Sequence, residues 1–250
     1  MIYNSSLWRN CILAFYASAF GPTGTKAWDN SYKQQHGTFN GLAPDVAWGV
    51  YLGRQMLATP AASAQFCDFG SFTLPASFSI MAWLNPVTAA SSSKIYISNE
   101  NSAGSAGFSI GINSSNNLYG RIGTGLMTAN SAASAGTTYC VILTGDTSSG
   151  TPSLYINNVT QSGTSATVSS YNAGGNLYLG KRPTGLSTQP GDSRIYEFRI
   201  YDRILTAQEI TVLSSNIGIS YVTPRRVQPG TVAVAASRKN FMNLGFPVTC

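Results

Sequence analysis

Apolar stretches of four to eight residues, separated by turns rich in Gly, Ser and Asn, recur along most of the chain. Some alternate: Tyr196, Phe198 and Ile200 are expected on one side of an extended segment, and the residues between them on the other. Many short strands with no long helix between them predict an antiparallel sandwich of two sheets. The predicted strands are residues 12–16, 78–84, 94–98, 108–112, 118–122, 139–144, 153–157, 177–180 and 194–201.

One helix is predicted, directly after the last strand. Thr206 and Glu209 have the spacing of a capping box, in which the Thr hydroxyl accepts from the N–H three residues on and the Glu carboxylate reaches back. Ile210 and Leu213 supply its short apolar face. Large aromatic side chains bury the most area, so we expect Trp83 and Tyr155 to anchor the core. The expected core comprises Phe78, Ile80, Trp83, Val141, Leu154, Ile156, Leu177, Phe198 and Ile200.

The character of the sequence changes after residue 220. We expect residues 1–220 to form one domain, and residues 221–250 an extended tail with apolar segments at 232–236 and 241–246. Segments this apolar need cover, so the tail either wraps its own domain or docks on a neighbouring subunit. Docking makes the following residues candidates for partner binding: Trp8, Arg225, Arg226, Arg238, Lys239, Phe241 and Phe246.

Charge narrows the set of functions. Charged residues make up 10% of the chain, against roughly 25% in an average soluble domain, and 43% of residues are hydrophobic. This composition excludes a charge-driven disordered chain and a coiled coil or surface-charged helical bundle. The net charge of +6 reflects nine acids against fifteen bases, and no basic run is interleaved with aromatic residues. We therefore expect no nucleic-acid partner.

The sequence also bears on location and cysteine chemistry. It has no stretch of about 20 apolar residues, and the apolar segment at 11–20 lacks the basic start of a signal peptide. We expect neither a membrane span nor an export signal. Cys11, Cys67, Cys140 and Cys250 show no zinc-type spacing and allow three disulfide pairings. Cys67 and Cys140 lie in strand-like stretches, where a free Cys acts as a small buried hydrophobe.

Five segments together resemble laminin-G-like, concanavalin A-like jelly-roll domains, from residue 13 to about 213. Residues 36–41 (HGTFNG) and 78–86 (FSIMAWLNP) resemble the family segments NHGTLTG and FTISAWVKP. The other three are LYINNV at 154, LYLGKR at 177 and EFRIYDRILTAQEI at 197, which resemble LYINGV, LYIGRR and AEVRIYDRALSAEEI. The resemblance implies an all-β jelly roll with one short helix. In such a fold His36, the single histidine, is expected to be a turn or packing residue.

The start of the chain is similar to a narrower group, the stand-alone proteins of this fold encoded by tailed phages and prophages. The similarity is carried by residues 21–24 (GPTG), 29–31 (DNS), 36–38 (HGT) and 44–48 (PDVAW), and by Pro-Arg-Arg at 224–226. It implies a virion location, with other virion proteins or copies of the chain itself as partners. We expect a homo-oligomer such as a trimer, or docking on a capsid lattice, through the two ends of the chain.

The fold family includes glycanases, which place two carboxyls around the scissile bond. Glu100, Glu197 and Glu209 lack the Glu-x-Asp-x-x-Glu spacing of the glucanase members. No nucleophile elbow accompanies the histidine, as a serine triad would require. We therefore expect no catalytic residues and no enzymatic activity.

Laminin-G-like domains often hold calcium at the rim of the sandwich. The loop acids that could serve here are isolated from one another, which favours Asx-turn roles over a weak single-carboxylate calcium site. No other cofactor or metal is expected. These acids are Asp29, Asp68, Asp146 and Asp192.

Two functions remain. The first is a virion structural protein, such as a capsid decoration or head-fibre type surface subunit. The alternative is an extracellular carbohydrate-binding module, in which Trp28, Tyr32 and Trp48 stack on the faces of surface glycans. Packing of the long N-terminal loop onto the sandwich would also explain these three aromatic residues.

Overall fold

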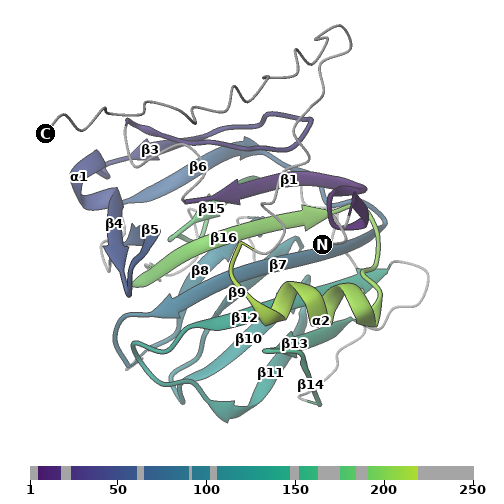
Figure 1. Cartoon of the computed structure of the whole chain (residues 1–250). Helices are drawn as coiled ribbons and strands as arrows, with labels where there is room; N and C mark the ends of the chain where they lie inside the picture. Colours follow the sequence, from purple (N-terminus) through teal and green to yellow (C-terminus); the bar gives the residue numbers. More distant parts are fainter. Residues whose placement is uncertain are drawn as a thin grey trace, which may run out of the picture.

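The computed structural model describes residues 5–17, 24–60, 65–89, 92–101, 106–146, 152–162, 175–183 and 191–218, which form a β-sandwich with little helix (Figure 1). The strands are β1 (Cys11–Tyr16), β2 (Lys26–Ala27), β3 (Gly37–Asn40), β4 (Trp48–Tyr51), β5 (Arg54–Thr59), β6 (Phe66–Ser71), β7 (Ser77–Pro86), β8 (Lys94–Ser98), β9 (Phe108–Ile112), β10 (Asn117–Ile122), β11 (Gly125–Ala132), β12 (Tyr139–Asp146), β13 (Ser153–Ile156), β14 (Val159–Gln161), β15 (Asn176–Leu179) and β16 (Ser193–Tyr201). The helical elements are the 3-10 turn η1 (Ser5–Trp8), α1 (Pro44–Ala47) and α2 (Ala207–Ser215).

The strands form two antiparallel sheets. Sheet A has the order β14-β13-β12-β7-β16-β5-β4, and β1 pairs with β16 beside this path. Sheet B has the order β11-β10-β9-β8-β15-β6-β3-β2. In Figure 1 sheet A faces the viewer with α2 in front of it, and sheet B lies behind. The predicted two-sheet jelly-roll sandwich is confirmed, and strands β2 to β6, β11 and β14 are additions to the prediction.

The main core lies between the sheets, where inward-facing residues of both form one buried cluster. Phe15 and Phe108 add large rings to it from β1 and β9. Full burial of such side chains is worth about 1.5–3 kcal/mol each, so this layer provides much of the driving force for folding. The expected core residues found here are Phe78, Ile80, Val141, Leu154, Leu177, Phe198 and Ile200, with Ile156 packed against them.

A second apolar cluster covers the outer face of sheet A beneath α2. Trp83 belongs to this cluster, and its Nε1 donates to Leu213 O in α2 at 3.1 Å. Tyr155 packs against the same cluster. The expectation that these two rings anchor the core between the sheets is wrong. Because successive strand residues face opposite sides, the inward positions of β7 on either side of Trp83 belong to Ala82 and Leu84.

A β-bulge in β16 overturns part of the predicted alternation. The pairing of β16 with β7 skips Tyr196, which is therefore an extra residue in the strand. One extra residue shifts the alternation by one position, so the side chains before it point to the opposite face from the one that simple alternation predicts. Ile195 consequently faces the main core together with Phe198 and Ile200, whereas Tyr196 faces the outer cluster.

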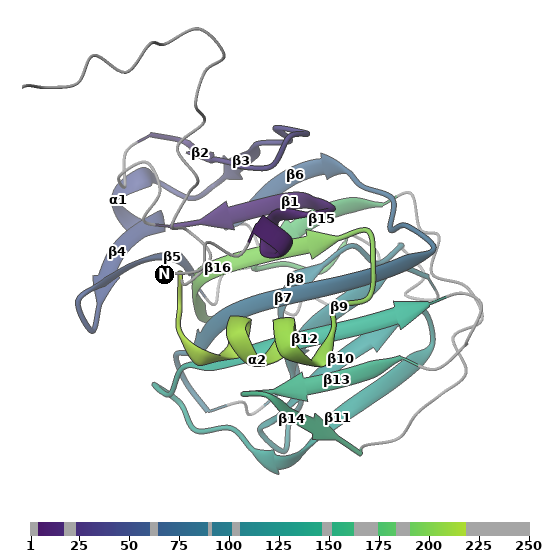
Figure 2. The same cartoon turned by 45° about the vertical axis from the view of Figure 1, so that its right-hand side comes forward.

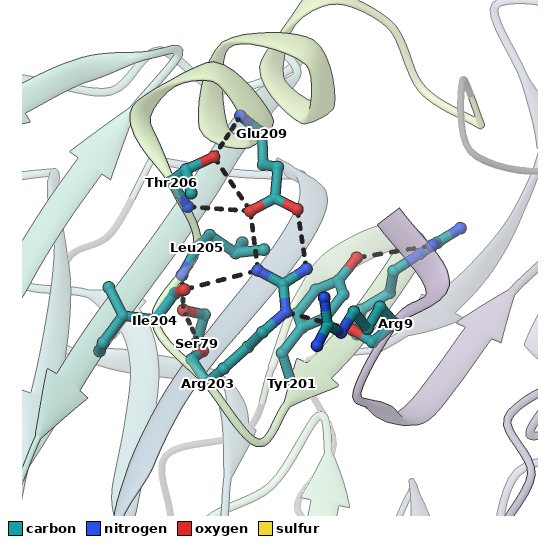
Figure 3. Close-up of polar contacts among 9 residues, drawn as sticks. Arg9, Ser79, Tyr201, Arg203, Ile204, Leu205, Thr206 and Glu209 are labelled. Carbon is teal, nitrogen blue, oxygen red and sulfur yellow. Dashed lines mark hydrogen bonds and ion pairs between the residues drawn. The ribbon is translucent and has the colours of Figure 1, made fainter. Parts of the chain in front are cut away.

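Helix α2 begins with the predicted capping box. Thr206 Oγ1 accepts from Glu209 N at 3.3 Å, and Glu209 Oε2 accepts from Thr206 N at 2.9 Å (Figure 3). A one-turn helix, α1, is an addition to the prediction; it starts at Pro44, whose fixed φ suits a first helical position. No helix in the described ranges is long and apolar enough to cross a membrane.

The β13–β14 turn and the cysteines are two further local features. Asn157 and Asn158 both have positive φ, of 50° and 69°, as a tight two-residue hairpin requires. Cys11, Cys67 and Cys140 are buried and carry free thiols, so Cys67 and Cys140 pack as expected. The fourth cysteine and the predicted tail, residues 221–250, lie outside the described residues.

Candidate ligand-binding surface

The loop between β2 and β3 lines an open depression of about 490 Å³. Figure 2 shows β2 and β3 at the end of the sandwich next to β1. Two of the sequence-predicted ligand residues, Trp28 and Tyr32, line it. Their side chains are the most exposed aromatic groups in the described part of the chain, at 41% and 68%. The other lining residues are Asp29, Asn30, Ser31, Gln34 and His36.

Asp29 fixes the conformation of this loop from within. Its carboxylate is buried and accepts three backbone N–H groups: Oδ1 accepts from Ala14 and Ser31, and Oδ2 accepts from Gln35, each at 2.8 Å. Hydrogen bonds to a charged acceptor are roughly twice as strong as neutral ones. The loop is therefore held to β1 of sheet A and folded around one carboxylate.

A second anchor joins the loop to sheet B. Gln35 Nε2 donates to Phe69 O at 2.7 Å and to Ser71 O at 2.8 Å, at the end of β6. On the β1 side, Asn30 N donates to Ala14 O at 2.7 Å. The loop thus bridges the two sheets, and its exposed side chains project from a fixed backbone.

His36 sets the position of the Trp28 ring. The two rings meet edge to face, with centroids 4.6 Å apart and planes at 64°. His36 Nδ1 accepts from Asp29 N at 3.1 Å, which assigns the proton of the neutral imidazole to Nε2. The histidine therefore packs within the loop, and one face of Trp28 is held against it.

The surface combines exposed aromatic rings with polar groups. Asn30 contributes a shielded Nδ2 donor with no hydrogen-bond partner among the described residues. Aromatic faces contact the C–H face of a sugar ring, while nearby amides and hydroxyls pair with its hydroxyl groups. Rings and polar groups of these kinds are the groups that protein surfaces use to contact saccharides.

Trp48, the third predicted ligand residue, lies elsewhere. Its side chain is 9% exposed and belongs to the main core, between Phe15 and Phe39 at ring-centroid distances of 6.2 and 5.5 Å. Its Nε1 donates to Gly24 O at 3.2 Å. Trp48 supports the base of the β2–β3 region from within and contributes nothing to the exposed surface.

Of the predicted partner-binding residues, only Trp8 is described. It packs against the outer cluster of sheet A, and its ring lies 4.4 Å from the Arg199 guanidinium. Trp8 is thus engaged within its own domain. The remaining candidates, Arg225, Arg226, Arg238, Lys239, Phe241 and Phe246, lie outside the described residues.

The three glutamates have separate partners. Glu197 is buried and accepts from Arg199 Nε at 2.7 Å and from Gly218 N at 2.9 Å. Glu209 belongs to the capping box of α2, and Glu100 is buried beneath arginines on sheet B. Nowhere in the described ranges do three or more His, Cys, Asp or Glu side chains gather as metal ligands would.

A family model for the concanavalin A-like lectin/glucanases superfamily matches residues 59–211, more than half of the chain. The β2–β3 loop precedes the matched segment. No curated protein sequence matches the chain significantly. The narrower similarity of the N-terminal segment to phage proteins has no support from these comparisons.

Solved structures share the fold at low sequence identity. Trypanosoma rangeli sialidase in complex with sialic acid is 12% identical with a TM-score of 0.62, over 84% of this chain and 33% of the sialidase. Botulinum neurotoxin type C, whose cell entry depends on interaction with two ganglioside molecules, is 16% identical with a TM-score of 0.60, over 84% and 52%. The binding domain of Paraclostridial Mosquitocidal Protein 1 is 14% identical with a TM-score of 0.60, over 83% and 52%.

These structures correct one expectation from the sequence. The chain was expected not to be an enzyme, but the similar structures include sialidases, and that expectation is contradicted. It rests on the absence of one carboxylate spacing and of a nucleophile elbow, which test only one kind of glycanase and one kind of serine hydrolase. The chain spans about a third of the length of the sialidase chains, and at 12% identity the likeness shows the shared fold alone.

Proposed function

Because this chain belongs to the concanavalin A-like lectin/glucanases superfamily, we propose that it is a glycan-binding domain that uses the β2–β3 loop as its binding surface. The observation that carries the proposal is the pair of exposed rings, Trp28 and Tyr32, on a loop fixed by Asp29. A fixed loop loses little conformational freedom on binding, so more of the contact energy appears as affinity.

The chemistry of the depression favours a neutral saccharide. Asp29, the one carboxylate among the lining residues, is buried and already accepts three backbone N–H groups. The aromatic faces and the exposed Gln34 amide remain to contact the ligand. The ganglioside interaction of botulinum neurotoxin type C supports glycan binding in general, by analogy of fold, and favours no particular class of sugar at this loop.

The experiment is a printed panel of neutral oligosaccharides probed with the full chain, followed by titration calorimetry with the strongest ligand. Trp28→Ala should weaken binding roughly tenfold or more, the effect of losing about 1.4 kcal/mol. Trp28→Phe should retain part of the affinity, because a smaller aromatic face remains. Tyr32→Ala should also weaken binding.

Val159→Ala is a matched control, because Val159 is 61% exposed on β14, the strand at the far edge of sheet A. This variant should bind like the wild type. Equal affinities of the Trp28→Ala variant and the Val159→Ala variant would contradict the proposed surface, as would a panel with no neutral ligand.

A virion surface subunit is the second proposal, and it concerns where the domain acts. It rests on the resemblance of the chain's opening to phage proteins and on the apolar segments at 232–236 and 241–246 with their flanking bases. In this proposal the domain presents its glycan-binding loop while residues 221–250 attach it to other virion proteins or to further copies of the chain. The extracellular location is the alternative.

Mass spectrometry of purified particles tests this location directly. The chain should co-purify with the major capsid proteins. Deletion of residues 221–250 should abolish incorporation while the Tm of the domain barely changes. If the truncated chain keeps its Tm and is still incorporated into particles, the tail is not the attachment device. If the chain is absent from particles, the virion location is refuted.

A further inference from the structure

A second depression, of about 310 Å³, lies on the outer face of sheet B. It is lined by Tyr119 and Arg121 of β10, Leu126 of β11, Arg182 just after β15, and by Ser93, Asn113 and Thr124. Nothing in the sequence analysis or in the proposed glycan surface uses these residues. The site draws together side chains from segments far apart in the sequence.

The strand pattern explains why these side chains share one face. In β10, Leu118 and Ile122 belong to the main core. Tyr119 and Arg121 occupy the alternate positions of the strand, so their side chains point outward. Arg121 pairs with Leu126 across the β10–β11 hairpin. On the other side Tyr119 pairs with Gly111, where a Cβ would collide with the Tyr119 ring. The missing side chain lets the ring lie flat against the sheet.

A buried carboxylate holds the two arginines in place. Glu100 is 1% exposed; its Oε2 accepts from Arg182 Nε at 2.6 Å, and its Oε1 accepts from Ser109 Oγ at 2.8 Å. Arg121 Nη1 lies 3.7 Å from the same Oε1. Two guanidinium groups thus face one carboxylate, which leaves one positive charge in excess at a partly desolvated site.

Arg182 has donors to spare. Its side chain is 12% exposed, and among the described residues its polar partner is Glu100, reached through Nε. The guanidinium fork also carries two terminal amino groups, which suit a planar anion. Burial raises the pKa of Tyr119 to about 12, with the Glu100 charge adding to the effect, so the phenol stays neutral beside the arginines.

We propose that this depression, hereafter the arginine pocket, binds the carboxylate of an acidic sugar residue of the uronic acid class. Arg121 and Arg182 contact the carboxylate, and Leu126, which is 41% exposed, contacts the C–H face of the ring beside the largely buried Tyr119. The volume stands at the lower end of the range for small-ligand sites, roughly 300–1,000 Å³, which favours one sugar residue over a longer segment. The arginine pocket shares no lining residue with the β2–β3 surface, so the two sites stand or fall separately.

The test is titration of the full chain with D-glucuronate, using D-glucose as the neutral counterpart. Glucuronate should bind, glucose should bind at least tenfold more weakly, and glucuronate affinity should fall as salt is raised from about 10 mM to about 500 mM. Amide shifts in NMR spectra of the wild type should change around Thr124 and Leu126. Equal binding of the two sugars, or shift changes confined to other regions, would refute the arginine pocket.

Arg121→Gln is the decisive variant, because it removes one guanidinium and leaves the Arg182–Glu100 pair intact. It should lower glucuronate affinity about tenfold. Arg54→Gln is the matched control: Arg54 lies on β5 of sheet A and donates to Ile217 O and Asn216 Oδ1. If the two variants lower glucuronate affinity equally, binding reflects general charge attraction and the proposal is overturned.

If the Arg121→Gln variant fails to fold, Leu126→Glu tests the same pocket, because Leu126 is 41% exposed and a carboxylate there should repel glucuronate. Undiminished glucuronate binding by that variant would contradict the proposal. Trp28→Ala distinguishes the two sites. It should weaken neutral-glycan binding roughly tenfold or more and leave glucuronate affinity unchanged, so each proposal can fail without the other.

Discussion

Arg203 and Glu209 form a two-pronged ion pair that joins the end of β16 to the start of α2. Arg203 Nη1 donates to Glu209 Oε2 at 2.7 Å and Nη2 donates to Oε1 at 2.8 Å (Figure 3). The same carboxylate accepts from Thr206 N, so it caps the helix while it fixes the arginine. Arg203 Nε also donates to Arg9 O at 3.2 Å, which extends the link to the segment before β1.

This geometry predicts how stability depends on pH. Burial alone would raise the pKa of Glu209, but the hydrogen bonds from Arg203 and Thr206 outweigh it and hold that pKa below its usual value of 4.5. A carboxyl with a lowered folded-state pKa stabilises the fold above its unfolded-state pKa, and the contribution is lost as pH falls through the folded-state value. Glu209→Gln should therefore lower the Tm at pH 7, and the Tm difference should shrink as pH falls through the folded-state pKa, which lies below 4.5.

Tm measurements on both proteins from pH 7 to pH 3 test this expectation. The difference between them is the relevant quantity, because Glu100 and Glu197 are common to both proteins. A Tm difference that stays constant across the range would show that the charge of Glu209 contributes nothing. Thr206→Ala, which removes the cap hydroxyl and leaves the Arg203–Glu209 ion pair, should cost about 1 kcal/mol at pH 7.

Trp83→Ala should destabilise the protein by about 3–5 kcal/mol, because it empties a buried site between β7 and α2. Trp83→Phe should cost less, since it keeps most of the ring and loses the hydrogen bond to Leu213 O. Urea denaturation of the three proteins measures both effects. A cost for the alanine variant below about 1 kcal/mol would mean that α2 closes over the gap.

Asp29→Asn should loosen the β2–β3 loop. An amide cannot accept three backbone N–H groups as a carboxylate does, so at least one is left unpaired at a cost of about 1–3 kcal/mol. Amide hydrogen exchange in residues 29–35 should accelerate, and neutral-glycan affinity should fall even though both rings remain. Asp45→Asn in the first turn of α1 makes the same charge change as a control and should leave exchange in this loop unchanged.

The described thiols should resist modification in the native state. Burial raises the pKa of Cys11 and of Cys140 to about 12 and that of Cys67 well above its usual value, so almost no thiolate forms at pH 8. In a Cys250→Ser variant, a thiol-specific reagent should label no group in buffer and three groups in guanidinium chloride. Rapid labelling in buffer would indicate that β1 or β12 opens readily.

The fold could be predicted from the sequence further than the sites. Strand positions follow from local alternation, and the capping box follows from the spacing of Thr206 and Glu209. Local patterns do not show which face of a strand meets the other sheet, so Trp83 was assigned to the wrong layer. The bulge at Tyr196 is set by the pairing of β16 with β7, which alternation within one strand cannot reveal.

The sites show the same limit. Trp28 and Tyr32 are exposed whereas Trp48 is buried. This difference depends on tertiary packing, which the residues adjacent in the sequence do not determine. In the arginine pocket, Glu100 follows β8, Arg121 lies in β10 and Arg182 follows β15. These residues come together only when sheet B forms. Alternation at 118–122 would place Tyr119 and Arg121 on one face, and that was the one signal available in the sequence.

The pairing of β1 with β16 has a consequence for how the domain can be tethered. Leu7 of η1 packs in the outer cluster of sheet A, and Gly218 donates to Glu197 on that same face. Residues 5 and 218, between which the structure is described, therefore both lie on the layer that carries α2. A tether attached directly at either residue meets the α2 side of the sandwich, and the outer face of sheet B, with Arg121 and Arg182, is directed away from it.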